Sequence, residues 1–259
     1  MSRILLTVDG AVAHLRLNRP DKLNALDAAM VGELSARCSE VDGHPDIHVV
    51  ILSGEGKAFC AGGDIEAWSV ESPEQFGQRW VRDGHAAFDA LARLRQPVIA
   101  VLDGHALGGG LELAACADYR VAEEQVKIGQ PETGLGIIPG WSGTQRAVRR
   151  FGAQIVRRMA VFGDVFTAKE ALDLGLVDRV VATGEAMAAA NEIAASVLKR
   201  GPRATQLAKM MINAAEGEER ERIIEALAGS LAAGSDELEE GLAAFRGKRT
   251  PDFGRGRKT

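Results

Sequence analysis

Apolar and polar residues alternate along residues 4–17, on either side of the dipeptide Asp9-Gly10. Alternation with a period of two is typical of half-buried strands, and an Asp-Gly pair favours a tight hairpin turn. The pattern therefore predicts two antiparallel strands at the start of the chain. Asp27 then stands where a side chain can cap a helix running to about Val41.

A strand followed by a glycine-bearing loop and a helix is predicted twice in the next stretch. The apolar runs 48–52 and 98–102 are the strands, and the loops after them cover 54–63 and 103–109. Further strands are predicted at 119–122, 126–128 and 176–181, and further helices at 73–93, 110–117, 142–161 and 167–173. This alternation predicts an α/β fold whose sites lie in the loops that follow strands.

The pattern changes after Gly184, where no further strand is predicted. Alanine-rich helical segments are expected at about 185–200, 202–216, 218–231 and 235–246. We therefore divide the chain into an α/β core over residues 1–195 and a C-terminal helical region over residues 196–259. Apolar residues at helical spacing in this second region favour packing against another subunit over a separate binding module.

Composition narrows the class of protein. The chain has 259 residues, 46% of them hydrophobic, and a formal net charge of −5, which disfavours a nucleic-acid or anionic-membrane partner. Three cysteines without a CxxC pair suit a reducing compartment, and neither a targeting peptide nor a long apolar span is expected, so the prediction is a cytoplasmic protein. Thirty glycines are unusually many for a helix bundle.

Two glycine-rich loops follow predicted strands and precede predicted helices, at 57–65 and at 108–112. Glycines there let a ligand approach the main chain and leave amide N–H groups free to bind an anion. Glu112, in the first turn of the second helix, would repel a phosphate. A transient oxyanion on a carbonyl group fits better, with the nearby carboxylate transferring a proton.

A third glycine-rich segment, 130–140, adds the carboxylate of Glu132. Together these segments closely resemble the enoyl-CoA hydratase/isomerase family, whose architecture is the crotonase fold. The resemblance also includes residues 19–26 and Ala168, Glu170, Ala171, Gly175, Leu176 and Val177, and it reaches the tail segment 245–249. It implies a spiral of ββα units with a C-terminal helical region that packs subunits and closes a coenzyme A pocket, assembled as a homotrimer or a homohexamer.

The resemblance also implies roles for the residues of these loops. Gly63 and Gly109 would donate the two N–H groups that hold the thioester oxygen. Glu112 and Glu132 match the two acids with which hydratases add water across the 2,3 double bond of an enoyl-CoA. Since two carboxyls that converge on one water resist ionising together, one of them is expected to have a raised pKa. Coenzyme A enters as part of the substrate, and no metal or other cofactor is expected.

Further positions are expected to contact the substrate. The adenine would lie against the main chain near Ala25 and residues 61–65, and the phosphates near lysines, one of them from a neighbouring subunit. Trp68 and Trp141 would take up volume in the acyl pocket, which favours short, branched or otherwise compact acyl groups. The substrate-binding residues predicted in this way are Lys22, Ala25, Lys57, Ala61, Asp64, Ile65, Trp68, Trp141 and Lys248.

Other functions compete with hydration. Isomerisation of the double bond would use the same fold, and some relatives of this fold bind RNA, for which the basic residues between 146 and 158 are the candidate surface. Nucleophilic catalysis has little support, because Cys60 has no histidine partner that the sequence identifies. His105 is expected to pack or to form a hydrogen bond, and His44 and His48 are expected to be surface or turn residues without a metal.

Overall fold

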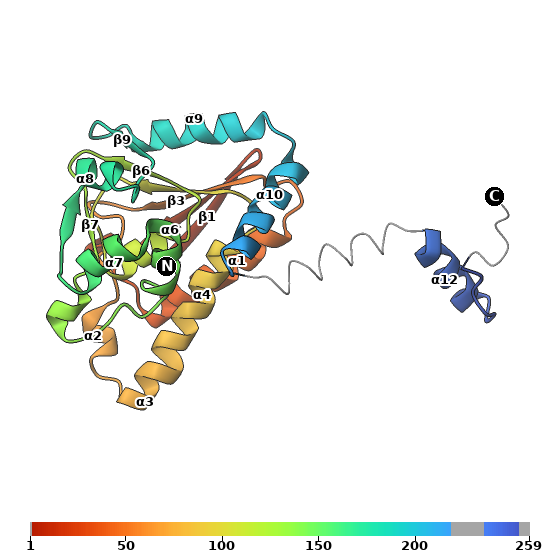
Figure 1. The fold of residues 1–259 in the computed structure, drawn as a ribbon, viewed down its shortest axis with the longest axis horizontal. Helices are drawn as coiled ribbons and strands as arrows, with labels where there is room; N and C mark the ends of the chain where they lie inside the picture. Colours follow the sequence, from red (N-terminus) through yellow and green to blue (C-terminus); the bar gives the residue numbers. More distant parts are fainter. Residues whose placement is uncertain (1, 219–235, 254–259) are drawn as a thin grey trace. The chain divides into compact units, whose positions relative to one another are not determined.

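The computed structural model describes residues 2–218 and 236–253 (Figure 1), and it contains two compact units, Met1–Lys209 and Met210–Thr259. The division predicted between residues 195 and 196 falls inside helix α9 (Ala186–Leu198). The first unit continues into α10 (Pro202–Ala215), where Lys209 Nζ lies 2.7 Å from Asp118 Oδ2 and 2.9 Å from the carbonyl oxygen of Gln96.

Within the described residues, no helix combines the length and the apolar character needed to span a membrane.

The first unit is built on a six-stranded sheet in the order β1-β2-β3-β4-β6-β9. The predicted hairpin is confirmed: β1 and β2 pair antiparallel, with Asp9 opposite Val12, and every other neighbouring pair in this sheet is parallel. The strands are β1 (Ile4–Asp9), β2 (Val12–Leu17), β3 (Val49–Gly54), β4 (Val98–Leu102), β6 (Tyr119–Glu123) and β9 (Arg179–Val181).

Alternate residues of the central strands enter two separate apolar cores. Val49, Ile51, Ile99 and Val101 pack beneath the alanine-rich face of α9, which runs along one side of the sheet (Figure 1). Their neighbours along β3 and β4 belong to the larger core on the other side, which also takes in buried residues of α1 (Ala28–Gly43) and α4 (Arg82–Ala92). Because β3 and β4 are buried on both faces, they appear in the sequence as continuous apolar runs.

The predicted start of α1 is confirmed in detail. Asp27 is the N-cap residue, and its side chain accepts a hydrogen bond from the backbone N–H of Met30 at 2.9 Å. A carboxylate at this position satisfies a helix N–H group that otherwise has no partner and also faces the positive end of the helix dipole. The loop between β2 and α1 is thereby fixed at the point where it passes the loop that follows β3.

A smaller sheet, ordered β5-β7-β8, lies beside the first, and only its middle strand was expected from the sequence. Its strands are β5 (Ala106–Leu107), β7 (Lys127–Gly129) and β8 (Val165–Thr167). Strands of two or three residues leave almost no periodic signal. Other short helices of the first unit are η1 (Pro20–Lys22), α2 (Ile65–Trp68), α5 (Gly109–Ala114), η3 (Glu132–Leu135) and α8 (Ala168–Asp173).

Two helices predicted as continuous are interrupted. The segment 142–161 forms α6 (Gln145–Phe151) and α7 (Ala153–Ala160), separated by Gly152 at φ 88°, a left-handed conformation that glycine adopts without strain. The segment 73–93 begins with α3 (Pro73–Gln75), continues as a π-helix, η2 (Phe76–Val81), and becomes α-helical only at α4.

The second unit contains α12 (Asp236–Arg246), which confirms the helix predicted at 235–246. Its first half carries Glu240, whose carboxylate accepts a hydrogen bond from Arg249 at 2.8 Å and one from the backbone N–H of Asp252 at 2.7 Å. These contacts fold the segment after the helix back onto it. The helix predicted at 218–231 lies outside the described residues, apart from Glu218.

Candidate active site

A pocket of about 170 Å³ opens between the loop after β3, the start of α5 and the loop that contains η3. Its wall is mostly apolar, and the two polar side chains that can ionise in it are those of Glu112 and Glu132. Apolar walls with a few convergent polar groups are typical of sites for small molecules and cofactors. The lining residues are Ala61, Gly62, Gly63, Ile65, Trp68, Phe76, Trp80, Leu107, Gly108, Gly109, Glu112, Pro131, Glu132, Leu135, Ile137, Ile138, Gly140 and Trp141.

The two glycines predicted to bind an oxyanion lie side by side in this pocket. A Cβ added to Gly109 would lie 3.4 Å from the amide nitrogen of Gly63, and one added to Gly62 would lie 3.4 Å from the amide nitrogen of Gly109. Gly109 is the first residue of α5, where backbone N–H groups have no partner inside the helix. The loop before it turns through Gly108 at φ 53°, a left-handed conformation. The arrangement presents two neighbouring amides to one small space.

Hydrogen bonds to Leu26 hold the Gly63 amide in place. Leu26 donates its N–H to the carbonyl oxygen of Gly62 at 2.8 Å, and its carbonyl oxygen accepts from the N–H of Asp64 at 2.7 Å. The peptide groups on both sides of Gly63 are therefore fixed, while the Gly63 N–H points away from Leu26 toward the pocket that this residue lines. A fixed donor needs little reorganisation when negative charge develops in front of it.

Glu112 comes from the first turn of α5 and is almost fully buried, with 3% of its surface exposed. Its Oε1 accepts two hydrogen bonds, from the backbone N–H groups of Trp141 and Gly143, each at 2.7 Å. Burial raises the pKa of Glu112 to about 7; the charge of Glu132 adds to the rise, and the two N–H groups oppose it. This carboxyl group is thus both held in a fixed orientation and able to exchange a proton near neutrality.

Glu132 approaches the pocket from the other side, at the start of η3. Both of its carboxyl oxygens are buried, and neither has a hydrogen-bond partner within the described part of the chain. Burial raises the pKa of Glu132 to about 7. A Cβ added to Gly108 would lie 3.2 Å from Glu132 Oε1, so the carboxyl group lies against the backbone that carries Gly109. A buried carboxyl with no partner leaves its hydrogen-bonding capacity for a ligand.

Aromatic rings form the wall behind the two amides. Trp141 is 3% exposed and lies between Trp80 and Phe88, with ring centroids 4.9 Å and 5.0 Å away. Its Nε1 donates to the carbonyl oxygen of Trp80 at 3.0 Å. Gly84 of α4 makes room for the indole, because any Cβ at that position would overlap it. Trp141 was predicted to line the pocket, whereas Trp80 and Phe76 were not singled out, although their i, i+4 spacing shortly after Trp68 was a usable signal.

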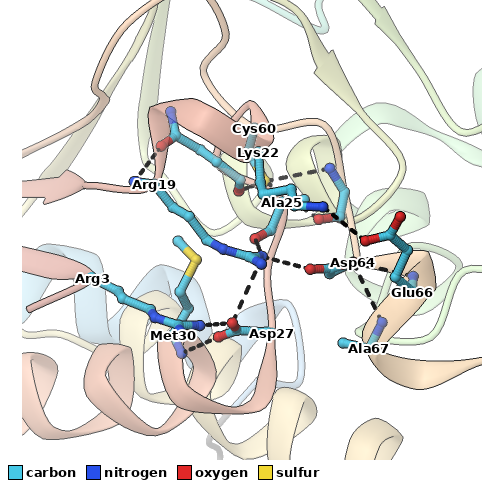
Figure 2. A network of polar contacts seen from close by, with 12 residues as sticks. Arg3, Arg19, Lys22, Ala25, Asp27, Met30, Cys60, Asp64, Glu66 and Ala67 are labelled. Carbon is cyan, nitrogen blue, oxygen red and sulfur yellow. Dashed lines mark hydrogen bonds and ion pairs between the residues drawn. The ribbon is translucent and has the colours of Figure 1, made fainter. Parts of the chain in front are cut away.

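Arg19 connects several parts of the site, as Figure 2 shows. Its guanidinium lies 2.7 Å from Asp64 Oδ2, donates to the carbonyl oxygen of Ala25 at 2.8 Å and lies 3.7 Å from Asp27 Oδ2. Asp27 is also paired with Arg3. The sequence analysis gave Arg19 no role, because no local pattern shows that its partners are two helix caps.

Asp64, predicted to bind substrate, uses its side chain within the protein. It caps α2, where Oδ1 accepts from the N–H groups of Glu66 at 3.1 Å and Ala67 at 3.4 Å. Burial opposes ionisation, but Arg19 and these N–H groups hold the pKa of Asp64 below its ordinary value. Its carboxylate is therefore charged and paired at neutral pH, next in sequence to the Gly63 amide.

The remaining residues predicted to bind the coenzyme lie mostly on the surface near this network. Lys22 pairs with Glu66 at 2.7 Å, and Lys57 and Ala61 are exposed. Ala25 is half-buried, and Ile65 lines the pocket with 48% of its surface exposed. The structure thus brings together all of these residues except Lys248, which lies exposed in the second unit and for which contact with a neighbouring subunit stays a prediction.

Three residues that were considered for other roles, Cys60, His105 and Arg146, also have defined surroundings in the structure. Burial raises the pKa of the Cys60 thiol to about 12, which leaves it protonated and a poor nucleophile at neutral pH. His105 accepts a hydrogen bond from the N–H of Lys127 at 3.1 Å, as the sequence analysis expected of it. Arg146, part of the candidate RNA-binding run, is 1% exposed and bonded to Asp89 at 2.6 Å, so it does not belong to a surface that a polyanion could reach.

Comparison with known proteins identifies the class of enzyme to which this fold and pocket belong. The sequence model that describes the enoyl-CoA hydratase/isomerase family matches residues 7–256. The chain belongs to the enoyl-CoA hydratase/isomerase family, whose members are enzymes.

Individual relatives are similar along most of their length. A crotonyl-CoA hydratase from Syntrophomonas wolfei is 36% identical over 256 residues, 96% of this chain and 97% of that protein. A short-chain-enoyl-CoA hydratase from Clostridium acetobutylicum is 38% identical over 214 residues, 82% of each chain. The crystal structure of an enoyl-CoA hydratase from Bacillus anthracis matches with a TM-score of 0.80 and 34% identity, covering 97% of this chain and 98% of that one. These matches confirm the crotonase-type α/β fold.

Proposed function

We propose that this protein is an enoyl-CoA hydratase, which adds water reversibly and syn to the double bond of a 2-enoyl-CoA to give a 3-hydroxyacyl-CoA. The observation that carries the proposal is that two buried carboxyl groups, both with pKa values raised to about 7, line one apolar pocket together with two adjacent glycine amides. Acyl-thioester chemistry needs donors for the carbonyl oxygen, and hydration needs a proton acceptor and a proton donor.

The two amides set where the thioester lies. With its carbonyl oxygen between the N–H groups of Gly63 and Gly109, the thioester is polarised, and electron density withdrawn toward the oxygen makes C3 electrophilic. Negative charge grows on that oxygen as water attacks C3, so the amides stabilise the enolate-like transition state more than the ground state. The rest of the acyl group then extends into the cavity bounded by Trp80 and Trp141.

Each of the two acids then makes one of the two proton transfers. Glu112, whose ionised form is favoured by two accepted N–H bonds, takes a proton from water as the water oxygen bonds to C3. Glu132, whose buried carboxyl oxygens have no hydrogen-bond partner among the described residues, gives its proton to C2. One proton is accepted and one is donated, so the pair ends with the opposite ionisation, and exchange with solvent restores the resting state. The proposal requires no redox cofactor, because no electrons are transferred to or from the substrate, and no metal, because the two amides polarise the carbonyl group and a carboxylate activates the water.

The aromatic wall supports a preference for short or compact acyl groups. Trp141 is fixed by packing against Trp80 and Phe88 and by its hydrogen bond to the carbonyl oxygen of Trp80, so it cannot rotate away at low cost. The relatives named as crotonyl-CoA and short-chain-enoyl-CoA hydratases point the same way. A homotrimeric or homohexameric assembly and a cytoplasmic location remain part of the proposal, and light scattering of the purified protein tests the first.

The test is to assay a panel of 2-enoyl-CoA thioesters of increasing acyl length. The reaction is monitored by the loss of absorbance of the conjugated double bond, and the mass of each product is measured. Hydration adds the mass of one water, whereas isomerisation leaves the mass unchanged, so the product identifies the reaction. We expect hydration that is fastest for compact acyl groups. Isomerised product without hydrated product would contradict the proposal, and catalytic efficiency that rises steadily to long chains would contradict the preference for compact acyl groups.

A further inference from the structure

All three tryptophans of this protein, Trp68, Trp80 and Trp141, line the one pocket that holds the two acids, and Phe76 lines it with them. Aromatic residues make up only 5% of the chain, so this concentration is not a general feature of its core. We propose that the pocket is built for an acyl group with an aromatic ring on C3, a 3-aryl-2-propenoyl thioester, in preference to an aliphatic group of the same size. This inference rests on the proposed function for its identification of the ligand as an acyl-CoA.

The position of the rings decides which part of the substrate they meet. A Cβ added to Gly63 would lie 3.1 Å from Trp80 Cζ2 and 3.5 Å from Trp68 Nε1, and one added to Gly109 would lie 3.0 Å from Trp141 Cζ3. The rings thus lie close to the two amides that would hold the thioester carbonyl, so they can meet the near part of the acyl group and not only the distant end of a chain. The substituent on C3, which begins three bonds from the carbonyl carbon, belongs to this near part.

The rings are also arranged as two fixed pairs. Trp80 and Trp141 are tilted by 50° with centroids 4.9 Å apart, and both are buried. Trp68 and Phe76 meet edge to face, at 62° and 5.5 Å, and are half-buried. Aromatic rings prefer such tilted and edge-to-face contacts because the ring face carries partial negative charge and the edge partial positive charge. A planar ring between the pairs can form the same contacts, whereas a saturated ring of equal size cannot.

The size of the pocket agrees with one ring. Its volume is about 170 Å³, and an apolar protein cavity of roughly 150 Å³ binds benzene. The apolar residues Leu135, Ile137 and Ile138 continue the lining toward the opening. The pocket holds a phenyl group and has little room for a long alkyl chain.

The inference is tested separately from catalysis by measuring how tightly the protein binds saturated thioesters, which have no double bond to react. The affinities of 3-phenylpropanoyl-CoA, 3-cyclohexylpropanoyl-CoA and butanoyl-CoA would be measured by isothermal titration calorimetry on the full chain. Because an aromatic contact adds roughly 0.5–1.5 kcal/mol beyond its buried area and each 1.4 kcal/mol is tenfold, we expect the phenyl compound to bind about two- to twelvefold more tightly than the cyclohexyl compound. Equal affinity, or tighter binding of the cyclohexyl compound, would overturn the inference.

Variants of the half-buried pair test its share of the preference. Trp68→Leu and Phe76→Leu are each expected to reduce the phenyl over cyclohexyl preference, because each removes one of the rings that meet the ligand, while Trp68→Tyr retains most of it. Phe162→Leu is the matched control, since Phe162 is 75% exposed and outside the pocket lining. A preference that is undiminished by the double change of Trp68 and Phe76 to Leu, in a protein with unchanged thermal unfolding, would also overturn the inference.

Hydration of crotonyl-CoA is measured in parallel as the test of the proposed function. If crotonyl-CoA and 3-phenylpropenoyl-CoA both remain unhydrated while the phenyl preference in binding is present, the proposed function fails and the aromatic selectivity stands. If crotonyl-CoA is hydrated and no phenyl preference is found, the selectivity fails and the proposed function stands.

Discussion

The backbone N–H of Trp141 lies 2.7 Å from Glu112 Oε1, so the residue that bounds the acyl pocket also orients one of the two acids. Gly143 supplies a second N–H at the same distance. Under the proposed function, the loop that limits the size of the acyl group is therefore also the loop that positions the carboxylate. A change in the shape of this loop is then expected to alter both the substrate preference and the proton transfer.

Replacing Glu112 or Glu132 by glutamine is expected to remove most hydration activity and leave the fold intact. The Glu112→Gln amide oxygen can still accept from Trp141 and Gly143, but neither variant can exchange the proton that the reaction needs. General acid–base groups contribute roughly 10²- to 10⁴-fold, so kcat should fall by at least about 100-fold in each. Steady-state hydration of crotonyl-CoA and thermal unfolding measure the two effects, and near-full activity in both variants would refute the mechanism.

The stability of the protein is expected to decrease as the pH rises from about 4.5 to about 7. Glu112 and Glu132 ordinarily titrate at 4.5, and burial raises the pKa of each to about 7. The folded protein therefore binds more protons than the unfolded chain in this interval, and the stability that these groups supply in acid is lost as the pH passes through their folded pKa values. The loss is on the order of 3 kcal/mol per group.

The double variant Glu112→Gln, Glu132→Gln isolates this effect in denaturant unfolding between pH 4.5 and 8. The difference between the wild type and the double variant removes the contributions of other groups, including Asp103, whose pKa burial raises to about 6. We expect the double variant to be relatively more stable at pH 8 than at pH 5. A difference that does not change with pH would show that the two carboxyls titrate normally.

Gly109→Ala is expected to fill the space in which the thioester oxygen binds. The added methyl would lie 3.0 Å from Trp141 Cζ3 and 3.4 Å from the Gly63 nitrogen. Loss of one oxyanion donor costs about 10²- to 10³-fold in kcat, and a blocked site should cost at least as much. Gly32→Ala is the control, because a Cβ there meets nothing within 4 Å on helix α1 and its activity should be unchanged.

Arg19→Ala is expected to lower both stability and kcat. Arg19 is 16% exposed and Asp64 8% exposed, and removing one member of a largely buried pair costs about 3 kcal/mol. Without Arg19, the Asp64 carboxylate that caps α2 loses its ion pair, and the neighbouring Gly63 amide is held less firmly in place. Arg37→Ala is the control, since its pair with Glu40 is largely exposed and worth less than about 1 kcal/mol. If Arg19→Ala unfolds at the wild-type denaturant concentration and keeps the wild-type kcat, the anchoring role is wrong.

Lys57→Ala is expected to weaken binding of the phosphate-bearing part of the substrate and to leave kcat unchanged. Lys57 is exposed beside the loop that carries Gly63, where its ammonium can meet a coenzyme phosphate. The KM for crotonyl-CoA should rise severalfold, and that for crotonyl-pantetheine, which lacks the nucleotide, should not change. Equal effects on the two substrates would exclude a phosphate contact.

The sequence predicted those parts of the fold that have long periodic signals. The hairpin around Asp9-Gly10, the cap at Asp27 and the buried runs 49–54 and 98–102 are each encoded within a few neighbouring residues. The strands at 106–107 and 165–167 were not found, because two or three residues carry no measurable period. The π-helical turn at 76–81 was also missed, since its sequence differs in no simple way from that of an α-helix.

For the site, the two glycine loops and the carboxylate of Glu112 could be predicted from residue type and position, whereas the role of Glu132 was predicted only through the resemblance to the enoyl-CoA hydratase/isomerase family. The hydrogen-bond and ion-pair partners of these side chains could not be predicted in this way. Asp64 was expected to bind substrate, but its carboxylate caps α2 and pairs with Arg19, 45 positions earlier in the sequence. Likewise, the packing of Trp141 against α4 depends on a contact between segments distant in sequence, which no local pattern reports.

The contact between Gly84 and Trp141 links the interior of a helix to substrate choice. A glycine in the middle of a helix costs roughly 0.5–1 kcal/mol relative to alanine, so α4 carries a local penalty at a position where the indole lies directly against its backbone. Any larger residue at 84 requires a smaller one at 141. In a mutational library, substitutions at the two positions should therefore depend on each other. Gly84→Ala should be tolerated only together with Trp141→Phe or a smaller side chain at 141. Each such pair of substitutions should widen the range of acyl groups that the protein accepts.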